Sequence, residues 1–260
     1  MDPSQLTYSV SGRIAHVTLN NPDRFNAIGP VMATELVQAL QAAGADDEVR
    51  VILLSGAGRA FCAGGDLAEL AAGLGRGDPG MAGFVDTLGR IAMLIRTTAK
   101  PVVASVHRSA AGAGLGLALL SDFCVASEDT RFMTAFAKVG LACDTGVGFV
   151  LARTLGHVRA TELFATGREL TAIDAHRLGL ITAVVPGDDL SQATVDLIGV
   201  LLTGSQAAFA AFKQQIWQAQ FAGFEQHLAQ EVALQRACAA GPDFAEGLAA
   251  FGERRPPEFG

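Results

Sequence analysis

The sequence predicts an α/β fold with a mostly parallel sheet, followed by a helical C-terminal region. Apolar runs typical of buried strands alternate with helical patterns up to about residue 200, and this alternation is typical of a parallel core. After the Pro-Gly pair at residues 186–187 the pattern is almost entirely helical. We therefore expect an α/β core over residues 1–200 and a helical region over residues 201–260.

The first elements are predicted from apolar alternation and from turn residues. Residues 6–10 and 14–19 alternate around a Ser-Gly pair, which predicts a β-hairpin. Pro30 suits the first turn of a helix, because its missing N–H would be unpaired there in any case. The apolar residues 51–54 then predict a buried strand, which leads into a glycine-rich loop.

The middle of the chain contains a segment that is harder to assign. Residues 71–90 hold six glycines and Pro79, so we expect part of this stretch to be a mobile lid or an irregular wall. The pattern continues as a helix over residues 91–95. A second buried strand is expected over residues 102–106 and a short one over residues 122–125.

The later part of the predicted core is richer in helical patterns. Residues 155–180 predict two helices that are split near Gly167. Residues 181–185 predict a strand that closes the sheet. From there to about Gly252 the periodicity is that of helices.

The composition indicates an ordered globular protein. Half of the 260 residues are hydrophobic, 17% are charged, and the net charge is −7 without any Lys/Arg-rich run. Nucleic acid and anionic membranes are therefore not expected as partners. The four cysteines are scattered, so no metal site or disulfide framework is expected. No signal peptide or membrane-length apolar run is found, so we expect a cytoplasmic protein whose apolar surplus is covered at a subunit interface.

Two glycine-rich loops carry the functional argument. Residues 60–66 read AFCAGGD and residues 111–116 read AGAGLG, and each loop lies between a predicted strand and a predicted helix. Small residues leave backbone N–H groups uncovered, so an anionic group can approach them. Two such loops side by side could direct two N–H donors at one oxygen, as an oxyanion hole requires. The spacing of the second loop differs from the dinucleotide-binding fingerprint.

Together with residues 20–27 (NNPDRFNA), 100–122, 167–180 and 247–255, these loops resemble the crotonase family, also called the enoyl-CoA hydratase/isomerase family. The resemblance covers nearly the whole chain. It implies a crotonase-like spiral of ββα units with a helical C-terminal trimerisation region, and a homotrimer or a dimer of trimers (a hexamer). It also implies an acyl-CoA thioester as substrate and no cofactor, because coenzyme A is part of the substrate.

The resemblance implies that the thioester oxygen is held by the backbone N–H groups of Ala63 and Ala113. Ala113 stands where glycine is usual in the family. The two glutamates that hydratases of this family use align with Gly116 and Phe136, and neither residue is a carboxylate. Loss of a general acid or base typically costs about 10²–10⁴-fold in rate.

One acid, Asp144, remains in the corresponding region. In similar crotonases an Asp at this position faces the acyl group and is the base of several enoyl-CoA isomerases. In aryl-CoA dehalogenases it is the nucleophile, but their essential His aligns here with Gly89. A carboxylate that takes a proton from C4 and returns one to C2 suffices for isomerisation. Asp144 could instead cap the helix that is expected to begin near Thr145.

The resemblance also implies a set of substrate contacts. Asp66 has an alternative role, because it could cap the helix that follows its loop. Phe84 and Met133 could complete an apolar acyl wall. The residues implied to bind the CoA or acyl group are Arg24, Asn26, Ala27, Ala63, Asp66, Leu67, Phe136 and Arg254.

The function that we expect is enoyl-CoA isomerisation, a 1,3-proton shift through a thioester enolate that is held in an oxyanion hole. One alternative is an enoyl-CoA hydratase, a lyase with atypical acid and base residues. The other is a catalytically weak protein that binds CoA esters.

Overall fold

The structure, a computed structural model, describes residues 4–75 and 80–260. Its main sheet has six strands in the order β1-β2-β3-β4-β6-β9. The first pair is antiparallel, and each of the other neighbouring pairs is parallel. The strands are β1 (Leu6–Ser11), β2 (Ile14–Leu19), β3 (Val51–Gly56), β4 (Val102–Val106), β6 (Phe123–Ser127) and β9 (Ala183–Val185).

The predicted hairpin and buried strands are confirmed. Leu6 of β1 pairs with Leu19 of β2, and along β2 every second residue is buried. Strands β3 and β4 lie in the middle of the sheet, where apolar residues are covered on both faces. A smaller sheet has the order β5-β7-β8, formed by β5 (Ser109–Ala111), β7 (Arg131–Met133) and β8 (Leu170–Thr171).

Helices cover the main sheet and connect its strands. The α-helices of this part are α1 (Pro30–Ala45), α2 (Leu67–Gly75), α3 (Gly80–Thr97), α4 (Ala113–Leu120), α5 (Val147–Leu155), α6 (His157–Thr166) and α7 (Ala172–Arg177). Short 3₁₀ turns are η1 (Pro22–Arg24), η2 (Ala137–Val139) and η3 (Gly187–Asp189). The predicted break at Gly167 is confirmed, because α6 ends there with the glycine at φ 56°.

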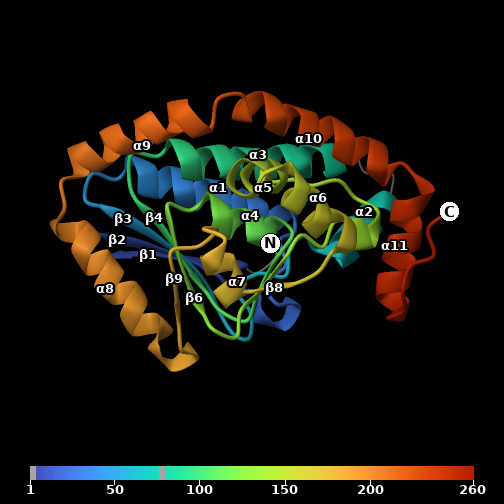
Figure 1. Ribbon diagram of the computed structural model, residues 1–260, viewed down its shortest axis with the longest axis horizontal. Coiled ribbons are helices and arrows are strands. Elements are labelled where there is room, and N and C mark those ends of the chain that lie inside the picture. The colour runs from blue at the N-terminus through green and yellow to red at the C-terminus, as the bar shows by residue number, and fades with distance from the viewer. Residues whose placement is uncertain (1–3, 76–79) are drawn as a thin grey trace.

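The predicted helical C-terminal region is present. It comprises α8 (Leu190–Thr203), α9 (Gln206–Gln220), α10 (Phe224–Ala239) and α11 (Pro242–Glu253). These helices wrap around the outside of the molecule as a continuous arc from orange to red (Figure 1). Helix α10 packs against α3, and α11 packs against η2. Residue 200 lies inside α8, which packs on β4 and β6, so the division into two regions stays a prediction.

The predicted lid over residues 71–90 is corrected in part. Residues 76–79 lie outside the described residues, but α2 reaches Gly75 and α3 begins at Gly80. Residues 84–90 are therefore helical rather than irregular. The apolar residues Phe84, Leu88 and Ile91 of α3 are buried in the core, and α3 packs against α1 and α10. This packing outweighs the low helix propensity of the glycines.

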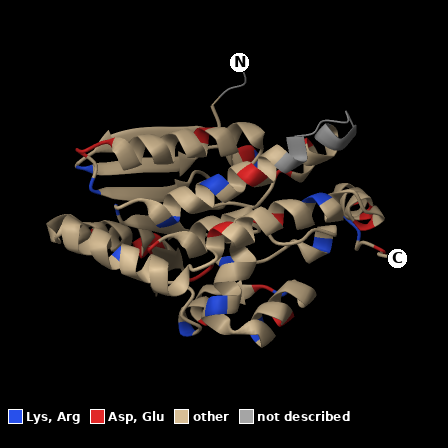
Figure 2. Cartoon of the chain, turned by 90° about the horizontal axis from the view of Figure 1, so that it is seen from above, with Lys and Arg blue, Asp and Glu red and all other residues tan. Residues whose placement is uncertain are grey.

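Charged residues are sparse on the ribbon and are separated by long uncharged stretches (Figure 2). Among the described residues, no single helix is long and apolar enough to cross a membrane. A bent pair, Gly187–Thr203 and Gln206–Gln220, reaches the required length and composition only together, with a bend of 104°.

Candidate active site

A cavity of about 300 Å³ lies where the two glycine-rich loops meet the turn that carries Asp144. The first loop lines it through Ala63, Gly64 and Gly65, and the second through Ala111 and Gly112. Most of the remaining lining is apolar. A largely apolar cavity with a few converging polar groups is typical of a small-molecule site.

Backbone hydrogen bonds hold the two loops side by side. The Cys62 N–H donates to the Ser109 carbonyl, and the Ala111 N–H donates to the Cys62 carbonyl, both at 3.0 Å. Gly64 has φ 101°, and a Cβ atom there would lie 3.0 Å from the Ala111 carbonyl oxygen. Glycine is thus required at residue 64 by both its conformation and the close approach of the loops.

The N–H groups of the first loop are not equivalent. The Ala63 N–H donates to the Phe25 carbonyl at 3.0 Å, so it is already used within the protein. The expectation that Ala63 supplies an oxyanion donor is therefore corrected. Two residues later, the Gly65 N–H has no hydrogen-bond partner within the described chain, and Gly65 lines the cavity.

The second loop presents the start of a helix. Gly112 adopts φ 50° and precedes α4, whose first residue is Ala113. The Ala113 N–H has no acceptor among the residues that the structure describes, as expected for the first turn of a helix. The predicted donor Ala113 is therefore available, and the positive end of the α4 dipole lies beside the cavity.

Asp144 lies in the cavity wall on a strained turn. Its side chain is buried, with Oδ1 accepting from Thr145 Oγ1 at 2.8 Å and Oδ2 accepting from Gln235 Nε2 at 3.0 Å. Thr145 has φ 53°, which is unusual for a β-branched residue. Helix α5 begins after Gly146 without a side-chain cap. The alternative that Asp144 caps this helix is therefore wrong.

The environment of Asp144 favours its neutral form more than water does. Burial raises the pKa of Asp144 to about 7, and the nearby Glu231 charge raises it further, while the hydrogen bonds from Thr145 and Gln235 act in the opposite direction. Both protonation states are then populated near neutral pH. Burial raises the pKa of the adjacent Cys143 thiol strongly, which agrees with a packing role rather than a nucleophilic one.

Of the two positions that align with hydratase glutamates, one has no room for a side chain and the other holds an apolar one. A Cβ atom at Gly116 would lie 2.7 Å from Cβ and Cγ2 of Thr145. At the other position the Phe136 side chain itself lines the cavity. Asp144 is the only carboxylate among the described residues that line this cavity. Asp86 lines a different cavity, between α1, α3 and α10.

Two residues that were expected to contact coenzyme A serve to build the first loop. Asn26 is fully buried, and its amide donates to the carbonyls of Ala57, Ala60 and Phe61 at 2.8–3.2 Å. The expectation that the Asn26 side chain contacts the ligand is therefore corrected. Asp66 is also buried, and its Oδ1 accepts from the N–H groups of Ala68 and Glu69, which confirms the helix-capping alternative.

The other expected contacts are distributed around the cavity and its surroundings. Arg24 is partly exposed and donates to Asp66 at 2.6 Å, and Ala27 beside this loop is half-buried. Arg254 is exposed after α11, while Phe251 of the same helix lines the cavity. The three candidates for an apolar acyl wall, Phe84, Met133 and Phe136, do line the cavity. Leu67, which was expected to contact coenzyme A, lines it as well.

Sequence reasoning missed the contribution of α10. Gln235 lines the cavity from this helix and contacts Asp144. Glu231 and His227 precede it at intervals of four residues, and Glu231 is buried as well. Polar residues at this spacing share one helix face, so the pattern was visible in the sequence, but the burial of that face was not.

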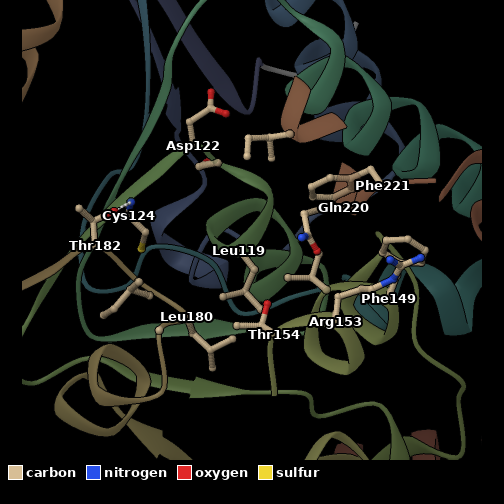
Figure 3. A pocket seen from close by; sticks show the side chains of 15 residues that line it. Leu119, Asp122, Cys124, Phe149, Arg153, Thr154, Leu180, Thr182, Gln220 and Phe221 are labelled. Atoms are coloured by element: carbon tan, nitrogen blue, oxygen red, sulfur yellow. Dashed lines mark hydrogen bonds between the residues drawn. The ribbon is translucent and has the colours of Figure 1, made fainter. Parts of the chain in front are cut away.

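A second cavity of about 530 Å³ lies between α5, α9 and the turn before β9 (Figure 3). Its wall includes Asp122, Phe149, Arg153 and Phe221, and it contains none of the expected site residues. In the part of the chain that the structure describes, no group of three or more His, Cys, Asp or Glu side chains is placed to hold a metal ion.

The family model described as "Enoyl-CoA hydratase/isomerase" matches residues 9–260. The chain belongs to the enoyl-CoA hydratase/isomerase family. Its fold is that of the crotonases, and it is an enzyme of this family. A solved enoyl-CoA hydratase from Mycobacterium avium subsp. paratuberculosis K-10 superimposes with a TM-score of 0.90 at 34% identity, with 98% of each chain covered.

Similar members of the family carry both isomerase and hydratase names. A trans-2-decenoyl-[acyl-carrier-protein] isomerase from Streptococcus mutans is 35% identical, covering 100% of this chain and 99% of the relative. The 1,2-epoxyphenylacetyl-CoA isomerase of Escherichia coli is 35% identical, covering 94% and 93%. The 2,3-dehydroadipyl-CoA hydratase of Escherichia coli is 33% identical, covering 98% of each chain.

Proposed function

We propose that this enzyme is an enoyl thioester isomerase that moves a carbon–carbon double bond between the C2 and C3 positions of an acyl-CoA. The observation that supports this proposal best is that Asp144 is the only carboxylate among the described residues of the cavity wall. A 1,3-proton shift needs one group that acts first as a base and then as an acid. Addition of water in this family is expected to need two.

In this mechanism Asp144 takes a proton from C4 of a 2-enoyl thioester. The C4–H electron pair becomes the C3–C4 double bond, the C2–C3 double-bond pair moves to C1–C2, and the carbonyl pair moves onto the thioester oxygen, which becomes negatively charged. The protonated Asp144 then delivers its proton to C2, which restores the thioester carbonyl. A pKa of about 7 suits both steps, because a catalytic group works best when its pKa is close to the working pH.

The developing charge needs donors that are free in the resting enzyme. We assign this role to the N–H groups of Gly65 and Ala113, which belong to the two loops that meet at the cavity. Such donors stabilise the enolate more than the ground-state carbonyl. No cofactor is required, because coenzyme A is part of the substrate.

For the rest of the substrate we propose an apolar acyl site and an exposed phosphate region. Leu67 and Phe136 line the cavity and contact the acyl or pantetheine part. Arg24 and Arg254 are exposed and are candidates for the phosphates of coenzyme A. Relatives act on both CoA and acyl-carrier-protein thioesters by name, so both carriers belong in the assay.

The decisive experiment measures deuterium incorporation at C2 and C4 of 2- and 3-enoyl thioesters in deuterated water, with the wild type and with Asp144→Asn. We expect exchange at both carbons with migration of the double bond, and a loss of about 10²–10⁴-fold in the variant. Water addition that survives the substitution would instead support the hydratase alternative. Tight binding of CoA esters without exchange would support the binding-protein alternative.

A second variant tests the oxyanion donors separately. Proline is tolerated at the first position of a helix, so Ala113→Pro removes the N–H group at the start of α4 with little change to the helix. We expect kcat to fall by about 10²–10³-fold while the Tm and the affinity for free coenzyme A stay close to those of the wild type. An unchanged kcat would remove Ala113 from the mechanism.

A further inference from the structure

Helix α10 contributes two buried polar side chains to the turn that carries Asp144. Gln235 is 2% exposed and donates from Nε2 to Asp144 Oδ2 at 3.0 Å. Glu231 is 4% exposed, and its Oε2 accepts from the Gly146 N–H at 3.0 Å. Because they are four residues apart, both side chains leave the same face of α10. A late segment of the chain therefore closes the back of the site.

Only one of the two polar atoms of the Gln235 amide has a hydrogen-bond partner among the described residues. Its Nε2 is used by Asp144, but its Oε1 is buried and has no hydrogen-bond partner among the described residues. Buried polar atoms are normally paired, and an unpaired one destabilises the fold. An apolar side chain of similar size would avoid this cost. Packing alone therefore does not explain why a glutamine is found at residue 235. Gln235 also lines the cavity beside Asp144, so its hydrogen bond to the carboxyl group is the better explanation.

We propose that Gln235 is a positioning residue for Asp144 and that Glu231, on the same face of α10, acts against it, so that this helix balances the two protonation states of the carboxyl group. The inference rests on the assignment of Asp144 as the acid–base group. The Gln235 N–H and the Thr145 hydroxyl each use one lone pair of the carboxylate, and each oxygen keeps another for the proton that it exchanges with the acyl group.

The two residues of α10 act in opposite directions on Asp144. Donation by the Gln235 N–H stabilises the carboxylate and lowers its pKa, whereas the charge of Glu231 raises it. Among the described residues, the other titratable groups near this site are Cys143 in the same turn, Lys138 of η2, which lines the same cavity, and His227, whose Nε2 lies 3.1 Å from Glu231 Oε1. Helix α4, on the opposite side, consists of Ala, Gly and Leu only.

This opposition gives a test in which the sign of the effect is decisive. In Gln235→Met the carboxylate loses a donor, so the acidic limb of the kcat/KM–pH profile should move to higher pH by about one unit, and kcat should fall about tenfold. In Glu231→Gln a negative charge is removed at nearly constant shape, so the same limb should move to lower pH. The exposed residues Gln230 and Glu225 on α10 provide the matched controls Gln230→Met and Glu225→Gln.

The inference would be overturned if the acidic limb of the kcat/KM–pH profile stayed in place, or if it moved in the same direction in both variants. This holds whatever the change in Tm. A ¹³C NMR titration of the Asp144 carboxyl in the free enzyme measures the same shifts without turnover and therefore applies even to an inactive variant. If Asp144→Asn abolishes exchange while the α10 variants do not shift the titration, only this inference fails. If Asp144→Asn leaves exchange intact, the proposed function fails instead.

Discussion

Asp144 is placed where its charged form is disfavoured. Its pKa in the folded protein is about 7, against an ordinary value of 3.8. Between these values the folded state binds a proton that the unfolded state has released. The stabilisation by this proton is therefore complete below about pH 4 and is lost as the pH rises through 7. At pH 8 the enzyme carries a buried charge that lowers its stability.

Asp144→Asn is accordingly expected to raise the stability at pH 8 while it abolishes activity. The Asn side chain carries no charge, and its N–H group can donate to Gln235 Oε1, which has no partner in the described chain. Because one pKa unit corresponds to about 1.4 kcal/mol, we expect a gain of roughly 2–4 kcal/mol at pH 8, which shrinks toward pH 5. Thermal unfolding at both pH values measures this, with the exposed Asp86→Asn as the control.

At the same scale the sequence predicted an acid that lines the cavity, Asp144, and an unpaired N–H group, that of Ala113, but it did not single out Gly65, the proposed second donor. The Phe25 carbonyl accepts the Ala63 N–H and thereby decides which N–H group of the first loop remains free. This carbonyl comes from a loop in which Phe25 and Asn26 both adopt positive φ. A motif gives the order of residues along the chain, but it does not say which donors a distant segment will use. The same limit applies to Asn26, a polar residue in a binding motif that proves to be buried.

At the scale of elements, helix α4 and the turn before α5 are in direct contact at Gly116. A Cβ atom at this position would lie 2.7 Å from Thr145, closer than non-bonded carbon atoms approach. We expect Gly116→Glu to destabilise the enzyme by about 1–3 kcal/mol through overpacking and to confer no hydration activity. The matched control is Gly199→Glu in α8, where a Cβ atom meets nothing within 4 Å. A folded variant that adds water to 2-enoyl-CoA would contradict this prediction.

The periodicity of apolar residues allowed most helices and strands to be predicted. Helix α3 is an element for which it gave the wrong expectation. Its glycines suggested an irregular wall, but its apolar residues are buried among helices from both ends of the chain. Helix α10, one of these neighbours, follows more than a hundred residues later in the sequence. Local propensity contains no information about such a partner, and packing against it decides the conformation.

At the scale of the whole molecule, a buried charge cluster joins the C-terminal helices to the core. Asp122 accepts from Arg96 of α3 at 3.0 Å and from Lys213 of α9 at 2.6 Å, and all three side chains are buried. Asp122→Asn leaves these cations without their counter-charge, so we expect a loss of about 3–5 kcal/mol in the free energy of unfolding. Urea unfolding measures this. The exposed pair of Glu162 and Arg168 provides the control, because solvent screens it and Glu162→Gln should change the free energy of unfolding far less.

Self-association is a further prediction at this scale. Trimers and hexamers are what the crotonase resemblance implies. The chain also has exposed apolar side chains on its outer helices, including Val195, Val200 and Phe212. We therefore expect light scattering to give three or six times the monomer mass of 26.9 kDa. A mass of one chain at micromolar concentration would refute the prediction. Neither the number of copies nor their arrangement could be inferred from the sequence. An excess of apolar residues indicates that some surface is covered, but it does not indicate which surface of the other copy covers it.

The contact between Gly116 and Thr145 also constrains how such an enzyme can diverge. The Thr145 methyl group fills the space beside Gly116, and its hydroxyl holds Asp144. A glutamate at residue 116 therefore requires the turn around Thr145 to move, because Cβ and the backbone oxygen of Thr145 are close to the added atom as well as Cγ2. Such a movement would also displace the Thr145 hydroxyl, so a side chain gained at residue 116 weakens the support of the carboxyl group at residue 144.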